Sequence, residues 1–432
     1  MLQRIDLRGV TGPVTDHLPR PDAPGDRPLD VVREIISAVR RDGDAALRAC
    51  TVRFDQVELE GLTVDAEEIH RAARRVSAPV REALQAAAAN IRRYHESQMP
   101  ADVTVGLDGL AIRAWHRPVR RVGCYVPGGR AVYPSTVLMT AVPACVAGVA
   151  EVALVVPPDP GGRVPDVILA AAATAGVTEV HPVGGAQAIA ALAYGTESIS
   201  PVDVIVGPGN TYVALAKQEV AGVVGVPSAF TGPSEVVVVA DGSSAPELAA
   251  IDLILQAEHG PDGLAWLVTW RTDVADRVTE AVTRLTAAAS RRSQIEATLC
   301  SSGHAVVCDS VEQAMAVVNA IAPEHLELHT ADPEAQLDLV HNAGAVFCGP
   351  WAPASLGDYI AGPSHVLPTS GSARFAGALT VGDFLKDIHI ITADRRGFEA
   401  VADHVVTLAE AEGLDAHAES IRIRRRQAGV DP

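Results

Sequence analysis

Four residues, Asp358, His365, His259 and His417, have side chains that a metal-dependent enzyme could use, and each lies in a turn-rich segment of a mostly aliphatic sequence. Imidazole, carboxylate and amide oxygen together suit a borderline divalent ion such as zinc. A carboxylate beside an imidazole also suits proton transfer. The residue types therefore predict a metal-assisted enzyme.

Segment 256–259 reads Gln-Ala-Glu-His and is followed by Gly-Pro, which is typical of a helix that ends there. Gln256 and His259 are three residues apart, so their side chains are expected on the same side of the last helical turn. The pair could place two metal ligands on one rigid turn. A surface pair without function is the alternative when this motif is judged alone.

Glu324 and His325 follow Pro323 at the boundary between a predicted helix and a predicted strand, a place where catalytic residues are often held. His325 could act as a general base at neutral pH. Glu324 could activate water if burial raises its pKa. A polar pair at a strand edge is the alternative.

Segment 357–369 combines several polar side chains with two glycines and two prolines, which favours ligand contact over a generic turn. His417 comes from a predicted helical piece near the C-terminus. A ligand so distant in sequence could come from a partner subunit, whereas a lone terminal histidine is more often exposed. The polar residues of the segment are Asp358, Tyr359, Ser364, His365 and Thr369.

Glycine-rich turns occur at 127–129, 184–187 and 207–210, and the last two directly follow predicted strands and precede helices. Backbone amides at such a turn could hold a diphosphate. None of the turns completes the pattern G-x-G-x-x-G, so tight strand-to-helix turns without a ligand are the alternative.

The fold class is predicted to be α/β. A chain of 432 residues exceeds one usual hydrophobic core, and an apolar content of 48% with only 4% aromatics is typical of parallel strands covered by helices. A long Ala-rich helix is expected over about 66–95. Strand-like and Ala-rich helical segments alternate over 121–234 and again over 236–348; after about residue 380 the pattern is mainly helical. We predict an N-terminal arm (1–29), a first lobe with the candidate metal and catalytic residues (30–123 plus 235–379), a second lobe with the glycine-rich turns (124–234) and a C-terminal helical piece (380–432).

The net charge of −18 disfavours nucleic acid and anionic membrane as partners. The six cysteines form no C-x-x-C pair, so we expect reduced thiols. The N-terminus carries charges where a signal peptide needs an apolar segment. The uncharged segment 131–150 is interrupted by Pro and Gly, which favours a buried helix over a membrane span. We expect a cytoplasmic protein.

With these residues laid out, the chain resembles the histidinol dehydrogenase family, the enzymes that end histidine biosynthesis. The matching segments occur in family order between about residues 120 and 425. They are Tyr-Val-Pro-Gly-Gly (125–129), Val-Gly-Gly-Ala-Gln-Ala (183–188), Gly-Pro-Gly-Asn (207–210), Gly-Pro-Ser-Glu (232–235), Gln-Ala-Glu-His (256–259), Pro-Glu-His-Leu (323–326), Gly-Asp-Tyr (357–359), His-Val-Leu-Pro-Thr (365–369) and Glu-Gly-Leu-Asp-Ala-His (412–417).

The resemblance implies two Rossmann-like parallel-sheet lobes with small N-terminal and C-terminal helical extensions, and a homodimer with a shared active site. It makes 124–234 the NAD-binding lobe, 30–123 plus 235–379 the lobe with the zinc and catalytic residues, and 380–432 the dimerisation piece. It implies one zinc per subunit, held by Gln256, His259, Asp358 and the His417 of the other subunit. Glu324 would activate water and His325 would transfer protons. Ser234, His365 and Glu412 would help these residues to hold the substrate, and Tyr125, Gln187 and Asn210 match the NAD positions.

The implied reaction oxidises L-histidinol, an amino alcohol, to L-histidine through an enzyme-bound aldehyde and reduces two NAD in succession. Ser364 stands where Asn commonly precedes the His-Val-Leu-Pro-Thr segment, and Phe230-Thr231 replaces the usual Pro-Ala. These departures leave open a paralogue with the same chemistry on another polar alcohol, such as a sulfonated diol. Two other classes are a zinc hydrolase that uses Glu324 without a nucleotide and a metal-stabilised binding protein. The first lacks an H-E-x-x-H helix, and the second leaves the acid-base residues unexplained.

Overall fold

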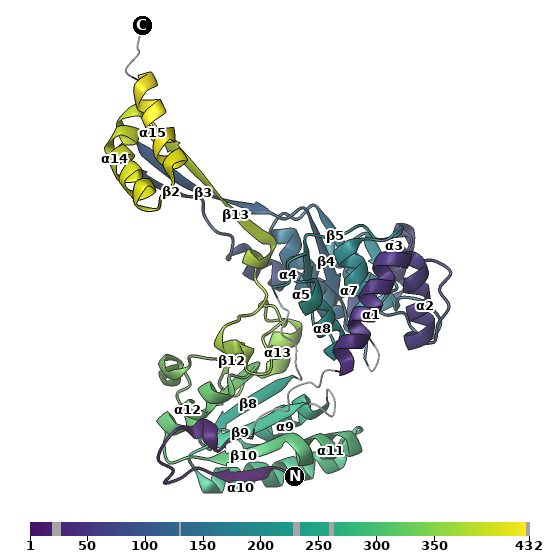
Figure 1. The fold of residues 1–432 in the computed structure, drawn as a ribbon. Coiled ribbons are helices and arrows are strands. Elements are labelled where there is room, and N and C mark those ends of the chain that lie inside the picture. The colour runs from purple at the N-terminus through teal and green to yellow at the C-terminus, as the bar shows by residue number, and fades with distance from the viewer. Residues whose placement is uncertain (20–26, 129–130, 228–233, 259–262, 429–432) are drawn as a thin grey trace. The chain divides into compact units, whose positions relative to one another are not determined.

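The computed structural model describes residues 1–19, 27–128, 131–227, 234–258 and 263–428. The chain divides into two compact units (Figure 1). The first unit comprises Met1–Gln98 and Arg120–Phe384, and the second comprises Met99–Val119 and Leu385–Pro432. The α/β class expected from the sequence is confirmed, because the first unit contains two parallel sheets.

The larger sheet of the first unit has six strands, all paired in parallel, in the order β1-β10-β9-β8-β11-β12. Alternate residues of its central strands enter different cores. Val236 and Val238 pack with the helices α9, α10 and α11, whereas Val237 and Val239 pack with α12. The strands are β1 (Gln3–Asp6), β8 (Glu235–Ala240), β9 (Leu264–Thr269), β10 (Gly303–Val307), β11 (His325–His329) and β12 (Ala345–Cys348), and the helices are α9 (Pro246–Glu258), α10 (Thr272–Ala288), α11 (Arg292–Ser302) and α12 (Val311–Ile321).

The smaller sheet has four parallel strands in the order β6-β5-β4-β7. One core joins it to α1, α2, α7 and α8, and the helices α3, α4, α5 and α6 pack against one another. The strands are β4 (Arg121–Tyr125), β5 (Glu151–Val155), β6 (Glu179–His181) and β7 (Val204–Val206), and the helices are α1 (Arg27–Asp42), α2 (Asp44–Asp55), α3 (Ala66–Arg75), α4 (Ala78–Glu96), α5 (Pro134–Val146), α6 (Asp166–Ala175), α7 (Gly185–Tyr194) and α8 (Thr211–Val220).

Two segments differ from the sequence-based expectations for the first unit. The division predicted from the sequence assigns residues 30–123 to the larger sheet, whereas α1 and α2 share their core with the smaller sheet. The helix expected over about 66–95 is two helices, α3 and α4, separated at Val76 and Ser77, both of which are extended. Pro79 explains the break, because proline is tolerated in the first turn of a helix but not in its interior.

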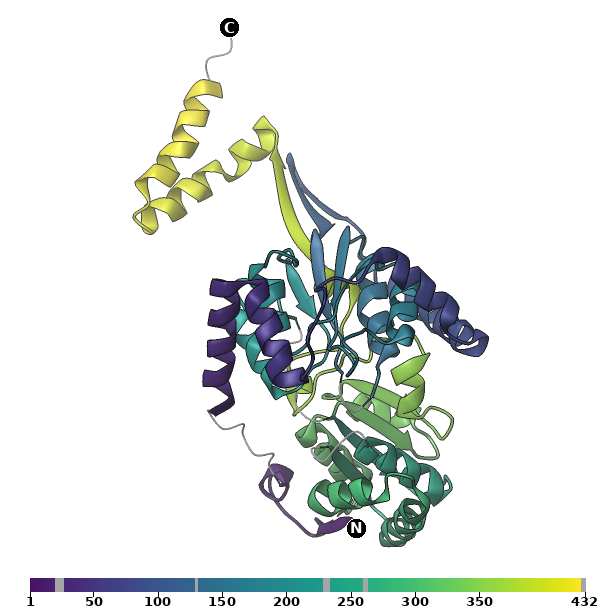
Figure 2. The same cartoon turned by 90° about the vertical axis from the view of Figure 1, so that its right-hand side faces the viewer.

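The second unit contains a three-stranded antiparallel sheet in the order β13-β3-β2 and two helices, α14 (Arg395–Ala411) and α15 (Asp415–Ala428), that pack against each other (Figure 2). The expectation of mainly helical structure after residue 380 is wrong for β13 (Leu385–Ala393). This strand pairs with β3 (Leu110–Pro118), which also pairs with β2 (Val103–Leu107). A partner so distant in sequence leaves no local signal.

Among the described helices, none combines the length and the apolar character that crossing a membrane requires.

Arg121, buried at the start of β4, joins two strands of the smaller sheet through Glu179. Burial alone would raise the pKa of Glu179, but hydrogen bonds from His181 and Arg121 outweigh burial and lower the pKa to about 2. A carboxyl group with a lowered folded-state pKa stabilises the fold above its unfolded pKa, and this contribution is lost as the pH falls toward the folded pKa.

We therefore expect Glu179→Gln to lower the free energy of unfolding at pH 7 by about 2 kcal/mol. The difference from the wild type should shrink between about pH 5 and pH 2. Urea denaturation across this range measures both. Glu151→Gln is the matched control, since Glu151 also binds Arg121 but is more exposed, and its effect should be smaller. Equal effects of the two substitutions would contradict the assignment.

Candidate active site

The site expected from the sequence centres on the amino ends of β8 and β11, which pair in parallel with His325 beside Val236. Glu324 directly precedes β11, and Ser234 directly precedes β8. The backbone N–H of Glu235 donates to Oε2 of Glu324 at 3.1 Å, and the Ser234 side chain also hydrogen-bonds to that carboxyl. Strand pairing thus brings together residues that are about 90 positions apart in the sequence.

Glu324 is buried, and this burial raises the pKa of its carboxyl, although nearby His325 and the hydrogen bonds oppose the shift. The direction is the one that the sequence analysis required of a water-activating carboxyl. Burial also raises the pKa of Glu235 to about 8, with a contribution from the charge of Glu324. The Glu235 side chain points to the face of the sheet opposite His325, where it lines a cavity of about 380 Å³ together with Trp266 and Arg374. That cavity is on the α12 side, away from His325.

His325 lies between two carboxyl groups. Its Nδ1 is 3.7 Å from Oε2 of Glu324, and its Nε2 is 3.4 Å from Oδ1 of Asp358. Burial would lower the pKa of His325, but the charge of Glu324 and the hydrogen bond and charge of Asp358 outweigh burial and raise it to about 9. Both contacts are longer than a good hydrogen bond, although the one to Asp358 contributes a weak one. The imidazole is therefore held between the two carboxyl groups mainly by charge.

Asp358 lies in the last turn of the short helix α13 (Ala354–Tyr359). Its backbone carbonyl is 2.9 Å from Nδ1 of His365, and Nε2 of His365 is 3.1 Å from the hydroxyl of Thr136 on α5. A carbonyl can only accept, so Nδ1 of His365 donates to it, whereas the hydroxyl of Thr136 can either donate to Nε2 or accept from it. Ser364 is also directed to α5, because its hydroxyl donates to the carbonyl of Met139 at 3.1 Å.

Gln256 lies near the end of α9 with 1% of its surface exposed, and its Nε2 has no hydrogen-bond partner among the described residues. As a crossover helix between parallel strands, α9 runs antiparallel to β11. Asp252, four residues earlier, contacts His329 at the carboxyl end of β11. Gln256 therefore faces the amino end of β11, where His325 lies. A buried amide nitrogen without a protein partner is costly and is typical of a site built for a ligand.

The other expected residues of this site fall elsewhere. His259, Phe230 and Thr231 lie outside the described residues. Glu412, at the C-cap of α14, and His417, on α15, are exposed and belong to the second unit. Of the residues expected to bind the substrate or the metal, those described within the first unit are Ser234, Gln256, Glu324, His325, Asp358 and His365.

The three residues expected to contact NAD lie at the carboxyl ends of strands in the smaller sheet or in the helices that follow. The Tyr125 hydroxyl, at the end of β4, accepts the N–H of Gly185 at 3.1 Å. Asn210 caps α8 by accepting the N–H of Val213 at 3.1 Å, and Gln187 is buried in the first turn of α7. Gly207 is required by packing, since a Cβ there would lie 2.1 Å from the Tyr125 carbonyl oxygen.

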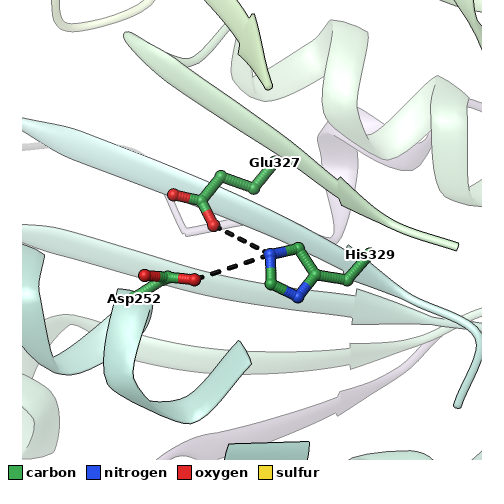
Figure 3. Close-up of side chains that lie close together, drawn as sticks. All are labelled: Asp252, Glu327 and His329. Atoms are coloured by element: carbon green, nitrogen blue, oxygen red, sulfur yellow. Dashed lines mark hydrogen bonds and ion pairs between the residues drawn. The ribbon is translucent and has the colours of Figure 1, made fainter. Parts of the chain in front are cut away.

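Sequence reasoning missed a buried group formed by Asp252, Glu327 and His329 (Figure 3). Nε2 of His329 is 3.1 Å from Oε2 of Glu327 and 3.5 Å from Oδ2 of Asp252. The segment His-Leu-Glu-Leu-His (325–329) contains the signal that could have revealed it, because alternation places positions 325, 327 and 329 on one face of the strand. The types suit a metal ion, but mutual hydrogen bonds already account for the arrangement.

A model of the family "Histidinol dehydrogenase" matches residues 19–425. The chain belongs to the histidinol dehydrogenase family. It is 50% identical to histidinol dehydrogenase of Moorella thermoacetica over 396 residues, which are 91% of this chain and 93% of that protein. It is 46% identical to that of Parasynechococcus marenigrum over 424 residues, 98% of this chain and 94% of the relative. The crystal structure of histidinol dehydrogenase from Elizabethkingia anophelis is 33% identical and superimposes with a TM-score of 0.94 over 99% of each chain.

Membership in the histidinol dehydrogenase family makes the protein an oxidoreductase and confirms the resemblance derived from the sequence motifs. It does not favour the paralogue that acts on a different alcohol, because relatives that match nearly the whole chain carry the histidinol name. The two departures therefore need another explanation. For Ser364, the structure supplies one, since its hydroxyl is used to bind the backbone of α5.

The Gln256 amide nitrogen, which has no partner among the described residues, allows a test of whether the site lowers the free energy of unfolding. Gln256→Met keeps the volume and removes the buried polar group, so the metal-free protein should become more stable by about 1 kcal/mol. Urea denaturation in the presence of a chelator measures this change. Gln313→Met is the matched control, because the Gln313 amide binds Asp309 and Leu7 and its loss should destabilise. A loss of stability in both variants would show that Gln256 has a structural partner.

Proposed function

We propose that the protein oxidises L-histidinol to L-histidine in two NAD-linked steps with one zinc per subunit, and that it keeps the intermediate aldehyde bound. The observation that carries the proposal is the buried pair Glu324 and His325, with Asp358 on the far side of the imidazole, in a chain of the histidinol dehydrogenase family. The proposed base His325 then lies between the carboxyl of Glu324 and that of Asp358, the proposed metal ligand.

The zinc would be held by Gln256, His259, Asp358 and a His417 contributed by a second copy of the chain. The described members fit the ion, since an amide oxygen and a carboxylate are suitable ligands and the buried amide of Gln256 has no protein partner for its nitrogen. Zinc would fix the polar groups of the substrate and polarise the reacting oxygen. A cation beside Asp358 would also offset one of the charges that raise the pKa of His325.

His325 would accept the hydroxyl proton while hydride leaves the alcohol carbon for the first NAD. The product of this step is the aldehyde. Glu324 would then take a proton from water as the water adds to the aldehyde carbon, and the hydrate would lose a second hydride to the second NAD. The burial of both residues supports retention of the aldehyde, because a site closed to water limits side reactions. Ser234, His365 and Glu412 would help to hold the substrate.

Tyr125, Gln187 and Asn210 would contact NAD. Their positions support this role, because ligands of parallel α/β sheets commonly bind beyond the carboxyl ends of the strands. The Tyr125 hydroxyl already binds the N–H of Gly185 at the start of α7, where an anionic group would bind.

The assembly would be a homodimer in the cytoplasm. The second unit carries His417 and exposes several large apolar side chains, which supports a surface that a second copy covers. These side chains are Val103, Val105, Leu107, Ile391 and Leu408.

The stoichiometry of the reaction tests the proposed function directly. Zinc-loaded protein should form two NADH per L-histidinol consumed, and chelated protein should form none. Absorbance at the NADH band together with chromatography of the products measures both. One NADH with release of the aldehyde would contradict the four-electron reaction. Absence of turnover while NAD still binds would contradict the substrate.

Glu324→Gln should slow aldehyde oxidation more than alcohol oxidation, because only the second step needs activated water. A decrease of about 100-fold or more is expected for the second step. Rates with L-histidinol and with the supplied aldehyde separate the two steps. Equal slowing of both would assign Glu324 to binding instead.

His417→Ala should lose zinc and activity while it remains folded, whereas His404→Ala, at an exposed histidine of the same unit, should keep both. Mixing the His417→Ala and Glu324→Gln proteins tests the shared site. If His417 comes from the partner, half of the dimers regain one intact site and activity recovers to about a quarter of the wild type. No recovery after verified subunit exchange would place His417 and Glu324 in the same chain's site.

A further inference from the structure

Asp252, Glu327 and His329 form a polar group in the core between α9 and β11, apart from the proposed substrate and metal contacts (Figure 3). All three are at least nine-tenths buried. Figure 3 shows that Nε2 of the imidazole is directed to both carboxyl groups. Buried carboxyl groups this close cannot both be charged at low cost. Burial, the charge of Glu327 and a hydrogen bond to Glu327 accordingly raise the pKa of Asp252 to about 8.

Glu327 is the member of the group on which the bonds converge. Oε2 lies within hydrogen-bond distance of His329 Nε2, and Asp252 also hydrogen-bonds to this carboxyl. Oε1 accepts the backbone N–H of Ala354 at 2.8 Å. Three donors around one buried carboxyl fix its position, since hydrogen bonds to a charged acceptor are short and strong.

Ala354 is the first residue of α13, and Asp358 lies one helical turn later. The bond from Glu327 therefore holds the start of the helix whose end carries the carboxylate beside His325. The same helix is packed closely on β12, since a Cβ at Gly357 would lie 2.7 Å from the Phe347 ring. The Phe347 ring is itself 5.9 Å from that of His325. A helix of only six residues has little stability of its own, so its position depends on contacts such as these.

We propose that Glu327, oriented by Asp252 and His329, is a positioning residue that holds α13 in the place where Asp358 can bind the zinc. The inference rests on the proposed function, since it requires Asp358 to be a metal ligand. Glu327 contacts neither the metal nor the substrate in this account. Its effect passes through a single backbone hydrogen bond, and that bond can be removed without altering any proposed ligand.

Ala354→Pro removes the N–H donor of this bond, while the backbone can keep its conformation. Proline is favoured at the first position of a helix, and Pro353 before it already has the extended conformation (φ −71°, ψ 157°) that a following proline requires. We expect the zinc dissociation constant, measured by chelator competition, to rise about 10- to 100-fold, as for loss of other groups that orient metal ligands. The affinity for NAD should stay unchanged. Ala66→Pro, at the first position of α3, is the matched control and should keep zinc affinity.

Substitutions of Glu327 give an independent second test. Glu327→Gln keeps an oxygen that can accept the Ala354 N–H, so its zinc affinity should stay within about threefold of the wild type, whereas Glu327→Leu should show the same loss as Ala354→Pro. Leu328→Ala controls for general damage to the core, because Leu328 is fully buried in the same strand but faces the opposite side. Cobalt bound in place of zinc reports the ligand geometry by its visible spectrum, which should change in Ala354→Pro and Glu327→Leu alone.

The outcomes separate this inference from the proposed function. If the wild type binds no zinc or cobalt, the metal assignment itself is wrong. If the wild type binds and folded Ala354→Pro has the same affinity and cobalt spectrum, the positioning role is wrong while the proposed function stands. Equal losses in Leu328→Ala and Glu327→Leu would also overturn it, since general destabilisation would then explain the effect.

Discussion

The parallel pairing of β8 with β11 is the constraint on which the candidate site depends. It sets His325 beside Val236 and brings the carboxyl of Glu324 to the backbone N–H of Glu235. A slip of one residue would move every side chain of β11 to the other face and send His325, Glu327 and His329 into the apolar core around α12. Burying those groups there without partners would cost far more than the pairing gains. The register is therefore fixed by the polar residues as well as by the aliphatic ones.

The candidate site residues lie at opposite strand ends in the two parallel sheets of the first unit. Candidate NAD residues follow the carboxyl ends of the smaller sheet, which is the usual position for a ligand in such folds, whereas Glu324 and His325 lie at the amino ends of the larger sheet. The crossover helix α9 explains how the amino ends can carry chemistry. It runs antiparallel to the strands, so its last turn delivers Gln256 to that edge. His365 and Ser364 then link the site to α5 beside the smaller sheet.

The sequence predicted most of the regular structure and the local motifs, because both depend on short-range patterns. Strands β5, β7, β8, β9 and β12 could be located from apolar runs, and Gln256 and Glu324 from their place at element ends. It could not predict β13, whose partner β3 lies about 270 residues earlier. Nor could it bring Asp252 to His329, since that contact depends on how α9 packs against β11. The break at Val76 did have a local signal in Pro79, but the Ala-rich pattern continues on both sides of it.

The site and the core beneath it handle buried polarity in opposite ways. Among the described residues, the Gln256 amide nitrogen has no hydrogen-bond partner and the His325 nitrogens have only long contacts to carboxyl groups, which lowers stability and leaves both side chains able to respond to a ligand. Further along the same elements, Asp252 of α9 and His329 of β11 direct hydrogen bonds to Glu327, which also accepts the N–H of Ala354. A network whose hydrogen bonds are all made is rigid, whereas a group without a partner can still bind a ligand. Because the rigid network lies on the same helix and strand as the candidate site, the reactive groups can keep their positions without strong hydrogen bonds of their own. Catalysis by preorganised groups requires such support.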